Sequence, residues 1–196
     1  MQFVYNDGGR SKYFTAQKVG DCGVRAICNA TGKDYKEVYN EINRLAKTER
    51  TGVRKHSISN ARNGVYRCTM HNYLSSIGWK WCPTMTIGSG CQVHLNEREL
   101  PEGTLILNLS GHFSCVKNGV LYDTYDCSRG GTRCVYGYWR KDPSFVAPKK
   151  DDQKPKCATK KRRPKKTKKR VSDSVRIKRL EKRVAELEAL IAELKK

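Results

Sequence analysis

The composition of the chain changes abruptly after Pro148, and this change limits the part that can fold as a globular domain. Residues 149–170 hold 13 basic and 2 acidic residues and almost no apolar side chains. A segment with so much charge of one sign cannot bury enough apolar surface to fold, so we predict a disordered basic linker there. Residues 1–148 are long enough for one domain with a hydrophobic core.

A heptad pattern follows the linker in residues 171–196. Ile or Val occupies position a and Leu occupies position d, a pattern that favours a parallel dimer, with a trimer as the main competitor. Arginines at position g would face glutamates at position e of the partner helix. The alternative is a single amphipathic helix docked on its own domain. We expect a C-terminal coiled-coil helix, and a homo-oligomer held by Ile177, Leu180, Val184, Leu187, Ile191 and Leu194.

The basic residues outnumber the acidic ones 40 to 19 over the whole chain, and about half of the net charge of +21 lies in the linker. We expect this block to contact nucleic acid or another polyanion through phosphate neutralisation, without reading sequence. The alternatives are a solvated spacer or, in a eukaryotic host, a nuclear-localisation signal. No aromatic residue interrupts the lysines, which argues against base stacking. The residues expected to make these contacts are Lys160, Lys161, Arg162, Arg163, Lys165, Lys166, Lys168, Lys169 and Arg170.

The nine cysteines form no C-x-x-C pair, and their number is odd. The first residues lack the charged and apolar regions of a secretory signal, and no apolar run reaches transmembrane length. We therefore expect an intracellular protein with mostly reduced thiols, cytoplasmic or, in a eukaryotic host, nuclear, and without contact to a membrane. Ligand pairs for a metal are missing, so we expect no metal and no cofactor; the alternative is a zinc site assembled from scattered cysteines and histidines.

The apolar periodicity divides the domain into helices followed by strands. Helical spacing begins at Cys22 and stops at Gly32, and it resumes after Asp34, a suitable N-cap. We expect an irregular, mobile surface loop over 48–68 and a short helix capped by Thr69. Short alternating runs suggest strands over 1–5, 79–82, 91–95, 105–109, 112–117, 120–123 and 134–139. The predicted class is α+β, with N-terminal helices packed on an antiparallel sheet.

Cys22 lies where a loop gives way to the first predicted helix, between Asp21 and Gly23. The positive end of the helix dipole favours a thiolate over a thiol at that position. A nucleophilic cysteine also needs a base within hydrogen-bonding reach and an acceptor that orients the base.

The pair Asn118-Gly119 is the strongest hairpin signal in the chain. A two-residue turn there pairs residue 117 with residue 120, and counting outward pairs residue 112 with about residue 125. His112 would therefore start one strand beside the end of the next. Asp123 and Asp126 bracket that point, so the hairpin brings a carboxylate to the imidazole by local geometry alone.

The order of Gln17, Asp21-Cys22-Gly23, Gly111-His112 and Asp123 resembles the papain-like cysteine peptidase superfamily. Within it the pattern is most similar to the bacteriocin-processing transporter peptidases and to small phage and bacterial proteins. The likeness covers about residues 10–140.

This resemblance implies a papain-like fold with Cys22 as nucleophile and His112 as general base and then acid. It also implies that Asp123 orients the imidazole, and that Gln17 and the backbone N–H of Cys22 bind the oxyanion. The His-to-Asp spacing of 11 residues is shorter than in many relatives, which leaves Asp126 as the alternative.

The expected function is a thiol-dependent hydrolase, a cysteine peptidase or isopeptidase that acts on a protein or peptide substrate. The alternative is a nucleic-acid-associated protein that keeps the papain-like fold as a non-catalytic binding module.

Overall fold

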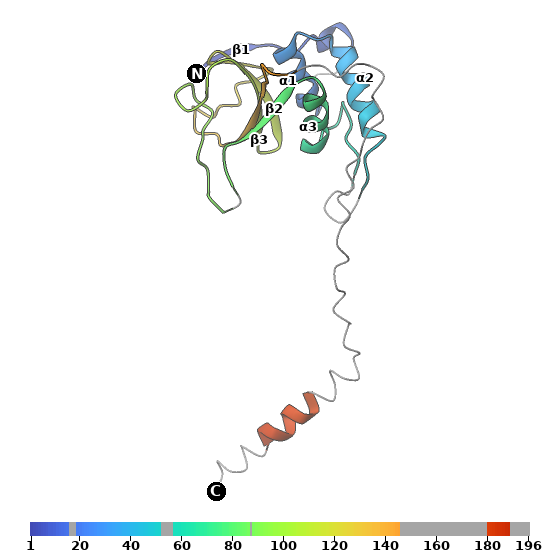
Figure 1. Ribbon diagram of the computed structural model, residues 1–196, viewed down its shortest axis with the longest axis vertical. Coiled ribbons are helices and arrows are strands. Elements are labelled where there is room, and N and C mark those ends of the chain that lie inside the picture. Colours follow the sequence, from blue (N-terminus) through green and yellow to red (C-terminus); the bar gives the residue numbers. More distant parts are fainter. Residues whose placement is uncertain (16–18, 52–56, 87, 146–179, 189–196) are drawn as a thin grey trace. The chain divides into compact units, whose positions relative to one another are not determined.

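The computed structural model describes residues 1–15, 19–51, 57–86, 88–145 and 180–188 (Figure 1). Two units, Met1–Lys149 and Lys150–Lys196, are described separately. The first unit is an α+β domain with three α-helices, a short 3₁₀ helix (η1, Arg10–Lys12) and a six-stranded sheet. The predicted linker lies outside the described residues.

The first two predicted helices are confirmed as α1 (Cys22–Thr31) and α2 (Tyr35–Ala46). α1 ends at Gly32, whose φ of 70° is a left-handed conformation that glycine adopts without steric cost. The carboxylate of Asp34 caps α2, accepting hydrogen bonds from the backbone N–H groups of Lys36 and Glu37 at 2.8 and 3.2 Å.

The prediction that Thr69 caps the third helix is wrong. α3 spans Arg67–Ser76, with Tyr66 in the N-cap position. The Thr69 side chain is buried and its hydroxyl lies 2.6 Å from that of Ser59. The hydroxyl of Thr69 therefore has its hydrogen-bonding partner in the segment before α3, and Thr69 itself lies within the helix rather than at its N-cap.

The described part of the predicted surface loop contributes to the core, in contrast to the expectation. Ala61 and Val65 are buried with the residues of the helices. The backbone N–H of Ala61 donates to Asn43 Oδ1 of α2 at 3.0 Å. Individual side-chain contacts and turns hold this segment against the domain. Its buried residues therefore do not recur with the period of a helix or a strand.

The sheet is mixed, not purely antiparallel as predicted. Its strands lie in the order β1-β5-β4-β3-β6-β2, and all neighbours are antiparallel except β1 and β5. The predicted strand over 91–95 is reduced to a single bridge between His94 and Cys134. The strands are β1 (Gln2–Tyr5), β2 (Trp79–Pro83), β3 (Thr104–Leu109), β4 (His112–Lys117), β5 (Val120–Asp123) and β6 (Val135–Lys141).

Each face of the sheet has its own hydrophobic core, because alternate residues of a strand point to opposite faces. The helices gather on one side (Figure 1), where Ile27 of α1 and Leu74 of α3 share a cluster with Ile106 of β3. Leu105 and Leu107, the neighbours of Ile106, belong to a second cluster that also contains Leu95. α1 is thereby fixed against β4, and its first residue faces the beginning of that strand.

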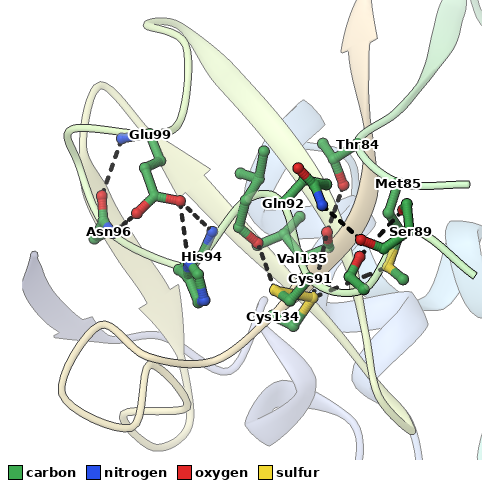
Figure 2. The surroundings of a disulfide bond; sticks show 12 residues. Thr84, Met85, Ser89, Cys91, Gln92, His94, Asn96, Glu99, Cys134 and Val135 are labelled. Atoms are coloured by element: carbon green, nitrogen blue, oxygen red, sulfur yellow. Dashed lines mark hydrogen bonds and ion pairs between the residues drawn. A yellow bond between two sulfur atoms is a disulfide. The ribbon is translucent and has the colours of Figure 1, made fainter.

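A disulfide joins Cys91 and Cys134, two cysteines 43 residues apart in the sequence (Figure 2). It ties the segment before β3 to the start of β6, beside the bridge of His94. Among the described cysteines, the free thiols include Cys22, Cys28, Cys82, Cys115 and Cys127, and Cys157 lies outside the described residues. The expectation of mostly reduced thiols thus has one exception.

In the second unit, residues 180–188 are helical. The predicted heptad residues Leu180, Val184 and Leu187 are 53–63% exposed in this helix. Ile177, Ile191 and Leu194 lie outside the described residues. Their spacing of four and three residues places these side chains on one face of the described helix.

We predict that Leu187→Lys abolishes self-association of the full chain, since it would place a charge in the apolar seam. Sedimentation over a range of concentrations gives the mass, which also distinguishes a dimer from a trimer. Ala185→Lys, on the same helix at position b, is the matched control and should retain the oligomer. Equal masses for wild type and Leu187→Lys would contradict the coiled coil.

Candidate active site

Cys22 is the first residue of α1 and is partly exposed. The preceding segment passes close to the turn at residues 60–64: a Cβ on Gly20 would lie 2.8 Å from the carbonyl oxygen of Asn63. As the first helical residue, Cys22 has a backbone N–H without an acceptor inside the helix. The thiol and this N–H therefore both sit at the positive end of the α1 dipole.

His112 is the first residue of β4, directly after the two-residue turn Ser110-Gly111 that connects it to β3. Gly111 has a φ of 63°, which this tight turn requires. Arg133 fixes the turn by donating to the carbonyl oxygen of Ser110 at 2.9 Å. The imidazole is buried, and His112 lowers the pKa of the Cys22 thiol.

The predicted hairpin places Asp123 beside His112. Lys117 pairs with Val120 around the turn, whose residues Asn118 and Gly119 both have positive φ. Continuing this register puts Ser114 opposite Asp123, with His112 two residues further on the same face of the sheet. The His112 Nε2 to Asp123 Oδ2 distance is 2.7 Å.

Asp123 is buried, and its carboxylate accepts four hydrogen bonds. Oδ2 faces His112 and accepts from the hydroxyl of Ser114 at 2.6 Å. Oδ1 accepts from Nη1 of Arg25 at 2.8 Å and from the backbone N–H of Thr124 at 2.7 Å. A carboxylate offers about four acceptor positions, so every one of them is used.

The alternative acid, Asp126, is not brought to His112. It is exposed and accepts a hydrogen bond from the backbone N–H of Ser128 at 2.8 Å, within its own turn. Gln17 lies outside the described residues, as do the nine basic residues predicted to bind nucleic acid.

The electrostatic surroundings favour a charged pair of Cys22 and His112. Burial alone would raise the pKa of Cys22, but the hydrogen bond and charge of His112, helped by the N–H of Phe113 and the charge of Arg25, hold it below its ordinary value. Burial also opposes the imidazolium. The hydrogen bonds to Asp123, Cys127 and Cys22 nevertheless raise the pKa of His112.

Burial and hydrogen-bonding partners also act in opposite directions on the pKa of Asp123. Its burial works against the carboxylate, yet His112, Ser114 and Thr124 lower its pKa below the ordinary value. By contrast, burial raises the pKa of Cys28, six residues after Cys22 in the same helix, to about 12. A position in α1 does not by itself lower the pKa of a thiol. Cys22 differs from Cys28 because it interacts with His112.

Four residues that sequence reasoning did not single out surround the site. Ser114 and Arg25 bind Asp123, Cys127 contacts His112, and the ring of Tyr125 lies 5.3 Å from the imidazole centre. The sequence contained a sign that Arg25 has a buried ionic partner, because this charged residue lies within the apolar run of a helix expected to be buried. Ser114 shares the strand face of His112 by alternation.

His112, Asp123 and Cys127 are the described residues whose donor atoms lie close enough together to hold a metal ion, all within 4.8 Å. Their hydrogen bonds oppose such a role. Both oxygens of Asp123 are already committed to four donors, and a protonated imidazole cannot ligate a metal. The donor set therefore fits a hydrogen-bonded cluster better than a metal centre.

No protein-family model, curated protein or solved structure matches the chain. None of the helices in the described ranges is both long enough and apolar enough to cross a membrane.

We predict that Asp123→Asn moves the pH midpoint of Cys22 alkylation upward. Without the carboxylate the imidazolium is less stable, so the pKa of His112 falls and the thiolate loses its counterion. Peptide-resolved mass spectrometry of iodoacetamide labelling against pH measures the midpoint. Asp126→Asn is the matched control and should label like wild type. Equal midpoints for both variants would refute the role given to Asp123.

Proposed function

We propose that the chain is a cysteine peptidase or isopeptidase with a papain-like catalytic arrangement. The observation that carries the proposal is the hydrogen bond between the buried His112 and Asp123, beside the Cys22 thiol whose pKa His112 lowers. A partly exposed thiol at a helix N-terminus, a buried imidazole and a buried carboxylate are the groups that acyl transfer by cysteine requires.

In the first step the Cys22 thiolate attacks the carbonyl carbon of an amide bond. The oxyanion that forms is bound by the backbone N–H of Cys22 and, from the sequence resemblance, by Gln17. His112, as imidazolium, gives its proton to the leaving nitrogen, and the C–N bond breaks to leave an acyl thioester on Cys22.

In the second step water attacks the thioester while His112 accepts its proton. The thiolate leaves, His112 becomes imidazolium again, and the carboxylic acid product is released. Asp123 remains ionised throughout, and its hydrogen bond with Nε2 orients the imidazole. Proteins, peptides and isopeptide-linked conjugates all carry the amide bond that this cycle cleaves.

A reducing compartment suits this chemistry, since oxidation of Cys22 would end catalysis. The proposal therefore places the protein inside the cell, in the cytoplasm or in the nucleus of a eukaryotic host. Cys22, Cys28, Cys82, Cys115 and Cys127 are free thiols, as such a compartment requires, whereas Cys91 and Cys134 form a disulfide.

We expect an acyloxymethyl ketone probe to label Cys22 at pH 6 on the order of 100-fold faster than the exposed Cys68. At that pH an ordinary thiol is almost fully protonated, whereas the pair with His112 keeps a thiolate. Labelling sites are read by mass spectrometry of the digested full chain. His112→Ala should slow Cys22 to the rate of Cys68.

Equal rates for Cys22 and Cys68 in the wild type would remove the basis of the enzyme proposal. So would an unchanged rate in His112→Ala, provided that circular dichroism shows the variant to be folded.

The charge of the linker supports a second proposal, that the chain also binds nucleic acid or another polyanion. Residues 149–170 carry a net charge of +11, from 13 basic and 2 acidic residues. In the non-catalytic alternative, this binding would be the function and the domain would keep the fold without the chemistry. In the enzymatic proposal, the linker would hold the catalytic domain near a polyanion.

We predict that affinity for duplex DNA of arbitrary sequence falls at least roughly 10³-fold between 50 and 200 mM salt, because six or more phosphates are neutralised. Fluorescence anisotropy measures the affinity. Deletion of residues 149–170 should abolish binding, while Cys22→Ala should bind like wild type. Binding that survives the deletion would show that the linker is not the contact.

A further inference from the structure

Arg25 is a guanidinium buried between two buried carboxylates. Its Nε donates to Asp21 Oδ1 at 2.9 Å, and its Nη1 donates to Asp123 Oδ1 at 2.8 Å. Nη1 also lies 2.7 Å from the hydroxyl oxygen of Thr124. Arg25 is 6% exposed, Asp21 0% and Asp123 3%, so water screens these ion pairs very little.

The two carboxylates belong to opposite sides of the candidate site. Asp21 directly precedes Cys22, and its second oxygen accepts from the hydroxyl of Tyr35 at 2.7 Å. Asp123 holds His112. One rigid guanidinium therefore connects the start of the helix that carries the thiol to the strand that carries the acid.

We propose that Arg25 is a positioning residue for the Cys22–His112–Asp123 site, which keeps Asp123 ionised with one oxygen turned to His112 and favours the thiolate of Cys22. The inference rests on the proposed function and assigns a role to a residue that does not touch the substrate.

The balance of charge around the site supports this role. Arg25 and Arg10, which lies 3.9 Å from Asp21, match the charges of Asp21 and Asp123. Transfer of the proton from Cys22 to His112 creates one anion and one cation, so it leaves the net charge of this region unchanged. Removing Arg25 would leave an excess of negative charge in a buried region, where it opposes a further anion on Cys22.

Arg25 also helps to fix the orientation of the Asp123 carboxylate. Arg25 and the N–H of Thr124 occupy Oδ1, which leaves Oδ2 for His112 and Ser114. Without the guanidinium, the carboxylate would be free to rotate and divide its oxygens differently among its partners.

The test compares Cys22 alkylation against pH in the full chain for wild type, Arg25→Gln, Arg25→Lys and the double variant Asp21→Asn/Arg25→Gln. The double variant removes one cation and one anion, so it keeps the net charge and guards against failure of Arg25→Gln to fold. Urea denaturation reports the stability of each.

Arg25→Gln should raise the midpoint of alkylation by one pH unit or more, which lowers the rate at pH 6 about tenfold. The double variant should have a midpoint between those of wild type and Arg25→Gln, because its charge is balanced again while Oδ1 of Asp123 still lacks the guanidinium. Arg25→Lys should return the midpoint most of the way, because the ammonium keeps the positive charge. Loss of stability alone would not move the midpoint of molecules that remain folded.

A wild-type midpoint in the folded double variant would overturn the inference while leaving the proposed function intact. A shift that Arg25→Lys fails to reverse would also overturn it, since packing rather than charge would then be responsible. A wild-type Cys22 that reacts like Cys68 would instead refute the proposed function, and the role of Arg25 with it.

Discussion

The carboxylate of Asp123 is the point at which the parts of the domain meet. It binds the imidazole and hydroxyl of β4, the backbone after its own strand β5, and the guanidinium of α1. A buried carboxylate is stable only when its acceptor positions are satisfied, so these four donors must arrive together. The arrangement that stabilises the charge is the same one that aims His112 at Cys22.

Two short turns and one packed helix produce this arrangement. The turns at Ser110-Gly111 and Asn118-Gly119 put His112 and Asp123 on adjacent strands with fixed registers. α1 is held against the sheet by apolar residues on its buried face, such as Ile27. The hydrophobic core thus sets the distance between thiol and imidazole, and the hydrogen bonds set the orientation and charge.

Local signals in the sequence were enough to predict the parts of the site that depend on neighbours in the chain. The Asn-Gly turn yields the register that brings a carboxylate to His112, and apolar spacing yields α1 with Cys22 at its start. Continued with strand alternation, the same register puts Asp123 on the face of His112 and residue 126 on the opposite face, but the prediction used only distance along the strands and left both aspartates open. The parallel pairing of β1, the Cys91–Cys134 disulfide and the bridge of Arg25 join distant segments, and no local pattern encodes such contacts.

β1 lies at the start of the chain but pairs with β5, so this part of the sheet can form only after β5 has been synthesised. Tyr5 pairs with Asp123, and the backbone N–H of Asn6 donates to the carbonyl oxygen of Asp123 at 2.8 Å. The ribosome releases Cys22 long before β4 and β5, which carry His112 and Asp123, so the thiol of the nascent chain at first lacks these neighbours. The contact with His112 that lowers the pKa of the Cys22 thiol can therefore form only after β4 has been synthesised.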